Sequence, residues 1–202
     1  MAEVGIIGAG SWGTALSLLL YKNGNQVTVW SALENEIQML KEEREQKDKL
    51  PGVKLPEDMI FTTNLEEAIK GKDVLVLAVP SPFTRSTSAK MKPYVKDGQI
   101  IVNVAKGIEE TTLMTLSEII EEEIPQANVA VLSGPSHAEE VGRGLPTTIV
   151  TGSKDKATAE YLQNLFMSEV FRVYTSSDVL GIELGAALKN VVALAAGIAD
   201  GL

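Results

Sequence analysis

The segment Gly8-Ala9-Gly10-Ser11-Trp12-Gly13 lies between two apolar runs of different length. The first run, Val4–Ile7, is too short for anything but a buried strand. The second run, Ala15–Leu20, is rich in helix-forming residues, and Asn23-Gly24 after it is a pair that stops helices. The pattern therefore predicts a strand, a glycine-rich turn and a helix in direct succession.

Each glycine of this turn has its own role in a phosphate-binding loop. Gly8 permits the tight turn, Gly10 lets a pyrophosphate approach the backbone, and Gly13 lets the helix pack closely on the strand. The N–H groups of the first helical turn would then face the anion, aided by the helix dipole. Glycines also mark ordinary turns, but the position between a strand and a helix favours dinucleotide binding over a purely structural turn.

The rest of the chain alternates short apolar strands with helices. Asp73–Val79 and Ile100–Val104 are near-continuous apolar runs, as expected for parallel strands that are buried on both faces. Thr112–Ile124 is predicted to be a helix, and the next strand follows at Val129–Leu132. This alternation predicts an α/β fold with a doubly wound, mostly parallel sheet. The other predicted elements are strands at Gln26–Trp30, Met59–Phe61, Thr147–Thr151 and Val170–Tyr174, and helices at Leu33–Glu45, Leu65–Ile69 and Ala157–Phe166.

The last segment, Val179–Ala199, differs in composition from everything before it. It is rich in Ala, Leu, Val and Gly, and it predicts one long helix that is buried all round. We therefore expect a dinucleotide-binding domain at residues 1–176 and the first helix of an otherwise absent α-helical domain at 177–202, so that the chain is a fragment. Without a partner domain, this helix is expected to self-associate as a homodimer or to pack back on the sheet.

Composition excludes several classes of protein and site. The chain has 202 residues, no cysteine, a single histidine and a formal net charge of −9. The charge argues against nucleic acid or an anionic membrane surface as a partner. The missing cysteines exclude disulfides and thiolate metal sites, and one histidine makes a Ser-His-Asp triad or a histidine metal site unfavourable. The N-terminus lacks the pattern of a signal peptide, and the apolar run Val191–Ala199 is too short to span a bilayer, so we expect a cytoplasmic chain without membrane insertion.

Polar residues follow two of the predicted strands at the edge where open α/β folds bind ligands. Lys106 comes just after Ile100–Val104 and precedes Gly107, which favours a functional lysine over an ordinary loop residue. Ser136 and Glu139 match the S-x-x-E capping box, so the structural interpretation of Ser136 is a helix N-cap. An anion or hydroxyl site at the same helix N-terminus is compatible with that role. His137 is interpreted as a packing or surface residue rather than a base.

Lys189 stands in the most apolar part of the chain. Its neighbours three and four positions away are Gly185, Ala186, Val192 and Ala193, so no carboxylate can pair with it within the helix. Such a lysine either extends to solvent or is held where desolvation depresses its pKa, which suits a general acid or base. Asn190 beside it adds a hydrogen-bonding group. The residues alone leave these two interpretations open.

The end of the second strand lacks the usual signal for coenzyme choice. Many NAD sites place a carboxylate there, roughly 20 residues after the glycines. Here Ser31 and Ala32 occupy that position, and no arginine is present for a 2′-phosphate. Glu34 could reach the ribose, but it is more typical of an acidic residue in the first turn of a helix. We therefore expect a loose coenzyme choice or a preference for NADH, with Lys49 as the candidate cation for a 2′-phosphate.

Five stretches form a joint pattern that covers the chain from end to end: Gly8–Leu16, Val79–Ser81, Ala105–Gly107, Gly134–Glu139 and Leu188–Val192. Asp200–Leu202 matches the segment that follows them in a known family. The pattern resembles the cytoplasmic NAD(P)-dependent glycerol-3-phosphate dehydrogenases. The resemblance implies a Rossmann sheet, NAD or NADP as cofactor, and hydride transfer to dihydroxyacetone phosphate that yields sn-glycerol 3-phosphate for phospholipid synthesis.

The same resemblance implies roles for individual residues. Lys106 would touch both cofactor and substrate, Gly134 and Ser136 would line the substrate, and Lys189 would exchange the proton with the substrate oxygen. Many members of the family carry arginine or histidine where this chain has Ala32, which puts a firm NADP preference in doubt. The cofactor-binding residues implied are Gly8, Gly10, Ser11, Trp12, Gly13, Lys106 and Ala138.

Two other functions compete with this hypothesis. A hydroxyacid dehydrogenase of the 6-phosphogluconate type would share the first domain and a lysine on the long helix, although Gly134–Glu139 argues against it. A non-catalytic nucleotide-sensing module would need the glycine turn but neither Lys106 nor Lys189. We also expect the 202-residue chain to bind cofactor but to show little turnover, because only one wall of a substrate site is present.

Overall fold

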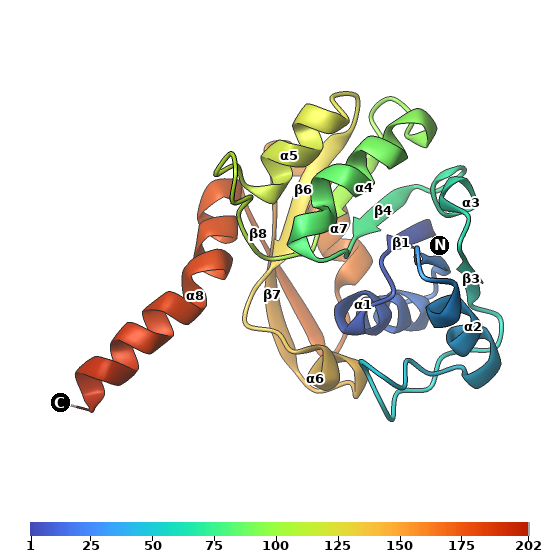
Figure 1. Cartoon of the computed structure of the whole chain (residues 1–202), viewed down its shortest axis with the longest axis horizontal. Helices are drawn as coiled ribbons and strands as arrows, with labels where there is room; N and C mark the ends of the chain where they lie inside the picture. Colours follow the sequence, from blue (N-terminus) through green and yellow to red (C-terminus); the bar gives the residue numbers. More distant parts are fainter. Residues whose placement is uncertain (202) are drawn as a thin grey trace.

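The computed structural model describes residues 1–201 and contains one eight-stranded sheet with helices on both faces (Figure 1). The strand order is β3-β2-β1-β4-β5-β6-β7-β8. The strands are β1 (Glu3–Ile7), β2 (Gln26–Trp30), β3 (Ile60–Thr62), β4 (Val74–Leu77), β5 (Ile100–Asn103), β6 (Asn128–Ser133), β7 (Thr147–Ser153) and β8 (Phe171–Ser176). The helices are α1 (Ser11–Lys22), α2 (Glu34–Glu43), α3 (Leu65–Ile69), α4 (Thr84–Met91), α5 (Leu116–Glu123), α6 (Ala138–Gly142), α7 (Lys156–Phe166) and α8 (Val179–Asp200), with short 3₁₀ turns at Ser81–Phe83 and Lys92–Tyr94.

All neighbouring strands of the sheet are parallel except β6 and β7. The chain enters the sheet at β1, proceeds to β2 and β3 at one edge, and then returns to the other side of β1 with β4. Ile7 accordingly pairs with Trp30 of β2 on one side and with Leu77 of β4 on the other. The prediction of a doubly wound, mostly parallel sheet is therefore confirmed. Ligands bind in such folds outside the carboxyl ends of the strands where the order reverses, here between β1 and β4.

Apolar side chains of the central strands alternate between two cores. Val74 and Val76 of β4 belong to the core that α1, α2 and α7 help to cover. Leu75 and Leu77 belong to the opposite core, which α3, α4 and α5 cover. This alternation follows from the period of two in a strand, and it explains why the run is apolar throughout.

The helices differ from the prediction in two places: one begins later than predicted, and one was not predicted at all. The helix predicted at Thr112–Ile124 begins only at Leu116, because Thr115 has extended backbone and closes a capping box with Glu118. The residues before it form a turn in which Leu113 adopts a positive φ of 62°. Helix α4 was not predicted, since its sequence from Thr84 to Met91 is dominated by Thr and Ser, which have low helix propensity.

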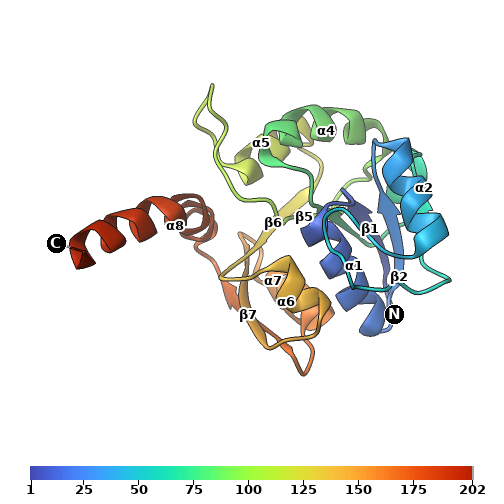
Figure 2. The ribbon, with the colours of Figure 1, turned by 60° about the horizontal axis from the view of Figure 1, so that its bottom comes forward.

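Helix α8 is present as predicted, but its expected burial is wrong for this chain. The helix extends away from the sheet and carries the C-terminus to its far end (Figures 1 and 2). Among its residues only Glu183 is buried, and Val191, Val192 and Leu194 each expose 64% or more of their surface. The helix contacts β6 and β7 near its start and does not pack back on the sheet.

By length and composition, α8 is the one helix of residues 1–201 that could cross a bilayer, with a mean hydropathy of 1.6. The run Val191–Ala199, which the sequence suggested was too short to span a bilayer, is only part of this helix, so the prediction was based on too short a segment. Core helices of globular proteins reach the same length and hydropathy, so this property does not distinguish a membrane span from a helix that another domain covers.

Candidate functional site: a pocket at the reversal of strand order

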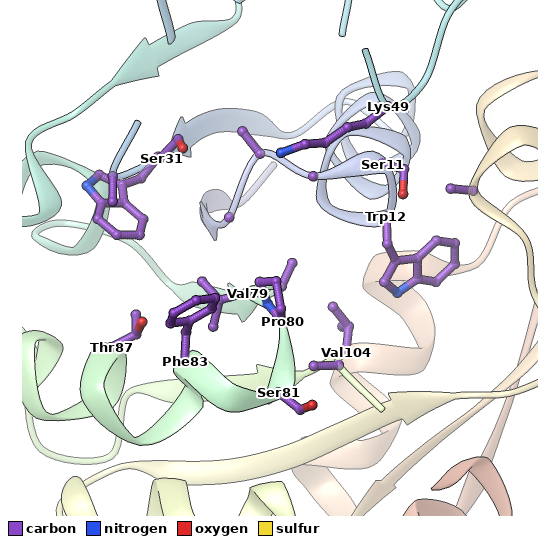
Figure 3. Close-up of a pocket in the computed structure, with 18 of the residues that line it drawn as sticks. Ser11, Trp12, Ser31, Lys49, Val79, Pro80, Ser81, Phe83, Thr87 and Val104 are labelled. Carbon is purple, nitrogen blue, oxygen red and sulfur yellow. The ribbon is translucent and has the colours of Figure 1, made fainter. Parts of the chain in front are cut away.

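A pocket of about 1100 Å³ opens at the carboxyl ends of β1 and β4 (Figure 3). Its walls come from the glycine turn after β1, from the segment after β4, and from the segments after β2, β5 and β6. In Figure 3, Ser31 and Lys49 lie on one side of the opening, and Pro80 and Phe83 lie on the other. The position is the one that the strand order predicts for a ligand.

The three glycines of the turn meet different surroundings. Gly8 has a φ of +124°, and a Cβ there would lie 2.8 Å from the carbonyl of Ala78. A Cβ on Gly13 would overlap the carbonyl oxygen of Gly8, so this position requires glycine for the helix to approach the strand. A Cβ on Gly10 would meet no atom within 4 Å. Gly10 therefore leaves open space beside the backbone, whereas Gly8 and Gly13 are needed for the fold of the turn.

The N-terminus of α1 faces this space with unpaired donors. Gly10 is the N-cap residue, and no side chain caps the helix. Ser11 and Trp12 begin the helix and line the pocket. Free N–H groups in a first helical turn, together with the helix dipole, form an anion-binding site. The local geometry thus fits a pyrophosphate at the position that the glycine motif predicts.

Charged side chains of the pocket offset the negative charge of the chain. Three lysines line it, namely Lys49, Lys90 and Lys106. Two carboxylates, Glu36 and Glu139, also line it. The pocket therefore carries more cations than acidic groups, although the whole chain has a net charge of −9. Such a local excess favours an anionic ligand. Within residues 1–201, no cluster of three or more His, Asp or Glu side chains could hold a metal ion.

A buried carboxylate at the end of β2 was missed by the sequence analysis. Glu36 lies in the first turn of α2, yet its side chain turns back to the strand end and accepts a hydrogen bond from the hydroxyl of Ser31. Gln46 Nε2 donates to Glu36 Oε1 at 2.8 Å, and Lys49 Nζ donates to the same oxygen at 2.6 Å. Only 7% of the Glu36 side chain is exposed. Glu34, the residue considered from sequence, is exposed and does not line the pocket.

Lys106 projects from the loop after β5 toward the loop after β6. Its Nζ donates to the carbonyl oxygen of Gly134 at 3.1 Å. Although the residue keeps an exposed surface, desolvation by the surrounding protein lowers the pKa of Lys106, and the positive charge of Lys189 lowers it further. The structure therefore brings Lys106 and Gly134 together and places Lys189 close enough to influence Lys106.

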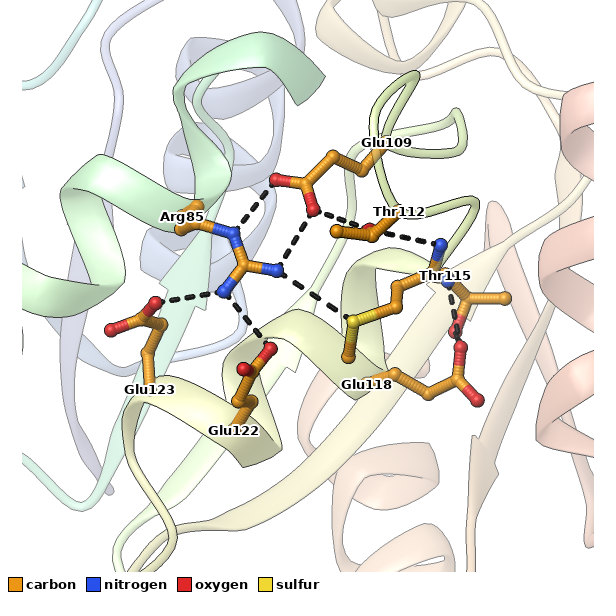
Figure 4. Close-up of polar contacts among 8 residues, drawn as sticks. Arg85, Glu109, Thr112, Thr115, Glu118, Glu122 and Glu123 are labelled. Carbon is orange, nitrogen blue, oxygen red and sulfur yellow. Dashed lines mark hydrogen bonds and ion pairs between the residues drawn. The ribbon is translucent and has the colours of Figure 1, made fainter.

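The loop that carries Lys106 is anchored by Arg85 of α4 (Figure 4). The guanidinium forms two hydrogen bonds of 2.8 Å with Glu109 of the loop. Its third nitrogen donates to Glu122 and Glu123 of α5 at 2.9 Å each. Arg85, aided by the hydroxyl of Thr112, lowers the pKa of Glu109 to about 2. One arginine thus holds α4, α5 and the loop after β5 in a fixed arrangement.

The residues after β6 lie beside Lys106, but not as the capping box that the sequence suggested. The N-cap of α6 is His137, and it makes no side-chain capping bond. The hydroxyl of Ser136 instead donates to the carbonyl oxygen of Gly134, at 3.4 Å. Ser136 lines the pocket and Ala138 is buried at its wall. The prediction of Ser136 as a helix cap is therefore wrong, and its hydroxyl lies at the pocket.

Lys189 lies outside the walls of this pocket, on the exposed part of α8. Its position depends on Glu183, six residues earlier and therefore about 9 Å back along the helix axis. The Glu183 carboxylate accepts from the backbone N–H of Ser117 at 3.0 Å and from the Ser117 hydroxyl. Ser117 belongs to the first turn of α5, where a carboxylate is favoured by the helix dipole. The other predicted site residues line the pocket or belong to the glycine turn, except Gly134, which contacts the pocket through Lys106.

The fold and this pocket define a Rossmann-like α/β domain. The sequence model of the "NAD-dependent glycerol-3-phosphate dehydrogenase N-terminus" matches residues 3–159, and the model of the corresponding C-terminus matches residues 178–202. The chain belongs to the NAD-dependent glycerol-3-phosphate dehydrogenase family.

Individual relatives agree with this assignment. The chain is 69% identical over 202 residues to a glycerol-3-phosphate dehydrogenase [NAD(P)+] of Agathobacter rectalis, and all of the chain aligns with 60% of that protein. It is 58% identical to the enzyme of the same description from Fusobacterium nucleatum, with 61% of that protein covered. The crystal structure of glycerol-3-phosphate dehydrogenase from Coxiella burnetii superposes with a TM-score of 0.91 at 33% identity, covering 99% of this chain and 61% of the other. The chain thus spans about three fifths of the length of these relatives.

Proposed function

We propose that this chain provides the coenzyme site and part of the substrate site of an NAD(P)-dependent glycerol-3-phosphate dehydrogenase. The reaction is reduction of dihydroxyacetone phosphate to sn-glycerol 3-phosphate, a precursor for phospholipid synthesis. The observation that carries the proposal is the pocket where the strand order reverses, with the uncapped N-terminus of α1 on one side and Lys106 on the other. Relatives that align with the whole chain are named glycerol-3-phosphate dehydrogenase [NAD(P)+], which supports the proposal.

The coenzyme site consists of residues around the glycine turn. The space at Gly10 and the free N–H groups of α1 fit a pyrophosphate, since a Cβ at Gly10 would occupy the space through which the pyrophosphate approaches the protein backbone. When bound, the reduced nicotinamide supplies the hydride for the carbonyl carbon of the substrate. The proposed coenzyme-binding residues are Gly8, Gly10, Ser11, Trp12, Gly13, Lys106 and Ala138.

The substrate end consists of charged and polar groups next to Lys106. The ammonium group of Lys106 binds and orients an anionic substrate. Ser136 lines the same end of the pocket, and the carbonyl oxygen of Gly134, the third proposed substrate residue, accepts hydrogen bonds from both side chains. We assign Lys189 as the proton donor to the carbonyl oxygen during reduction and as the acceptor in the reverse direction. Its closeness to Lys106 supports this role. We also place the boundary between the coenzyme domain and the helical segment at 176/177, and we infer a cytoplasmic location.

Steady-state kinetics test this function. In a chain of the full length of the relatives, dihydroxyacetone phosphate should drive NADH or NADPH oxidation, while 6-phosphogluconate and NAD(P)+ should give no turnover. Lys106→Ala should raise KM and lower kcat, because the lysine acts in binding and positioning. Lys90→Ala removes another pocket lysine and should leave kcat within a few-fold. Coenzyme binding without turnover of any phosphate substrate would instead favour the nucleotide-sensing module.

A further inference from the structure

The carboxylate of Glu36 lies at the coenzyme pocket, yet the known chemistry of the reaction gives it no role. It occupies the end of β2, the position from which open α/β folds recognise the adenosine ribose. The usual acidic residue follows the strand directly, whereas here α2 supplies it from its first turn. The fold therefore restores a carboxylate that the linear sequence of the strand end lacks.

The hydrogen bonds of Glu36 leave room for one more donor. An ionised carboxylate has about four acceptor sites, two on each oxygen. Oε1 accepts from Gln46 and from Lys49, while Oε2 accepts from Ser31 only. One acceptor site thus remains on Oε2, on a side chain that lines the pocket. A ribose 2′-hydroxyl, which donates one hydrogen bond, matches that site.

The carboxylate is fixed in place rather than mobile. Gln46 donates with one amide nitrogen both to Glu36, at 2.8 Å, and to the carbonyl oxygen of Ala9 in the glycine turn, also at 2.8 Å. Gln46 itself is fully buried. The same amide therefore connects the pyrophosphate-binding turn to the ribose end, so Glu36 cannot move away to admit a second anion without breaking this contact.

A 2′-phosphate would meet two opposing charges at this place. The buried carboxylate of Glu36 repels it, and the half-exposed ammonium of Lys49 attracts it. Lys49 is already paired with Glu36, so a phosphate must share or break that ion pair. Because Glu36 is buried while Lys49 keeps 47% of its side chain exposed, the repulsion is less screened by water than the attraction.

We propose that Glu36 is the specificity-determining residue for the coenzyme: its free acceptor site binds the 2′-hydroxyl of the adenosine ribose and selects NADH over NADPH. This inference rests on the proposed function, because it assumes that the pocket binds a nicotinamide dinucleotide. Lys49 moderates the selection, since it is the pocket cation that pairs with Glu36.

Calorimetric titration of the chain with NADH and with NADPH tests the proposal. The wild-type chain should bind NADH about tenfold to a hundredfold more tightly, the range for a hydrogen bond to a charged group. Glu36→Gln should narrow that ratio by at least about tenfold, chiefly through tighter binding of NADPH. Glu34→Gln makes the same charge change two residues away on an exposed side chain, and it should leave the ratio unchanged.

Lys49→Met provides a second variant in case Glu36→Gln fails to fold. It should weaken the binding of NADPH more than that of NADH and so widen the affinity ratio by about threefold to tenfold. The control is Lys47→Met, which removes an exposed lysine paired with Glu43 and should leave the ratio unchanged. Equal binding of both coenzymes, a preference for NADPH, or an unchanged ratio in both variants overturns the proposal and leaves the function intact. If the wild-type chain binds neither coenzyme, the proposed function fails and this inference fails with it.

Discussion

The coenzyme end and the proton-transfer end of the proposed site differ in how the chain supports them. The glycine turn and Glu36 are enclosed by strands, helices and a buried amide. Lys189, in contrast, stands on a helix whose only buried residue among those described is Glu183. A site that is enclosed by its own domain is preformed, whereas a residue on an exposed helix depends on the few contacts near the start of that helix, among them that of Glu183.

The largest expected effect lies at the exposed end. In a chain of the full length of the relatives, Lys189→Met should lower kcat by about two to four orders of magnitude, the range for loss of a general acid or base. NADH binding should change little, because Lys189 lies outside the coenzyme pocket. Lys156→Met removes another exposed lysine and is the control. Near-normal kcat for Lys189→Met would leave this residue as a surface lysine that extends to solvent.

At the enclosed end, two glycine variants should separate binding from folding. Gly10→Val should fold normally, because its Cβ meets open space, but it should lower NADH affinity by at least about a hundredfold by filling the approach of the pyrophosphate. Gly13→Ala should instead destabilise the chain by about 1–3 kcal/mol, because its Cβ overlaps the carbonyl of Gly8.

Calorimetry and thermal unfolding of both glycine variants provide the measurements. Unchanged NADH affinity in a folded Gly10→Val variant would show that the pyrophosphate binds elsewhere. A Gly13→Ala variant as stable as the wild type would show that the close approach of α1 to β1 is not needed for the fold.

Much of this enclosed end could be predicted from sequence, because its signals are local. The glycine spacing and the apolar runs of β1 and β4 follow from short-range geometry and from burial on both faces. Glu36 could not be found in this way, since its contacts with Ser31 and Gln46 depend on how α2 and the following loop turn back. A carboxylate in the first turn of any helix has the same sequence signal.

Two capping motifs show the same limit. Thr115 with Glu118 and Ser136 with Glu139 both match the pattern of a hydroxyl residue followed three positions later by an acid. Only the first pair forms the reciprocal bonds. The second is displaced because α6 begins one residue later, after His137. The backbone conformation at the start of each helix determines whether the capping box forms, and the sequence pattern does not specify that conformation. For α8, composition predicted an apolar helix without a cover of its own, but the burial and the packing back on the sheet that were expected from it are not present in residues 1–201.

A smaller effect is expected at the anchor of α8. Glu183→Ala leaves the N–H and hydroxyl of Ser117 without their partner, which should weaken the attachment of α8 by about 1–3 kcal/mol. Hydrogen exchange should therefore become faster in the first turns of α8 while the sheet keeps its protection. Glu160→Ala, at an exposed position of α7, should change neither the exchange of α8 nor that of the sheet. Equal protection of α8 in both variants would show that its contacts with β6 and β7 hold it without Glu183.

The smallest effect concerns the charge of Lys106, which lies between the two ends. Its pKa is lowered from 10.5 by desolvation and then by Lys189. The protonated form binds a phosphate anion, so affinity for dihydroxyacetone phosphate at saturating NADH should fall as pH rises through this lowered pKa, before an ordinary lysine would titrate. Between pH 7 and 10, a loss of about threefold to tenfold is expected, because a surface-accessible ion pair contributes modestly.

Calorimetric titrations of Lys106→Ala and Lys189→Met identify which groups cause this pH dependence. Lys106→Ala should bind more weakly at every pH and lose most of the dependence, since the titrating cation is gone. In Lys189→Met the loss of affinity should move to higher pH, because removing one positive charge raises the pKa of its neighbour toward the ordinary value. Lys90→Met is the control: Lys90 lines the pocket, but its charge does not lower the pKa of Lys106, so the pH profile of this variant should keep the wild-type midpoint. If Lys189→Met leaves the midpoint where it is, then α8 does not hold Lys189 near Lys106, and the enclosed and exposed ends of the proposed site act without electrostatic coupling.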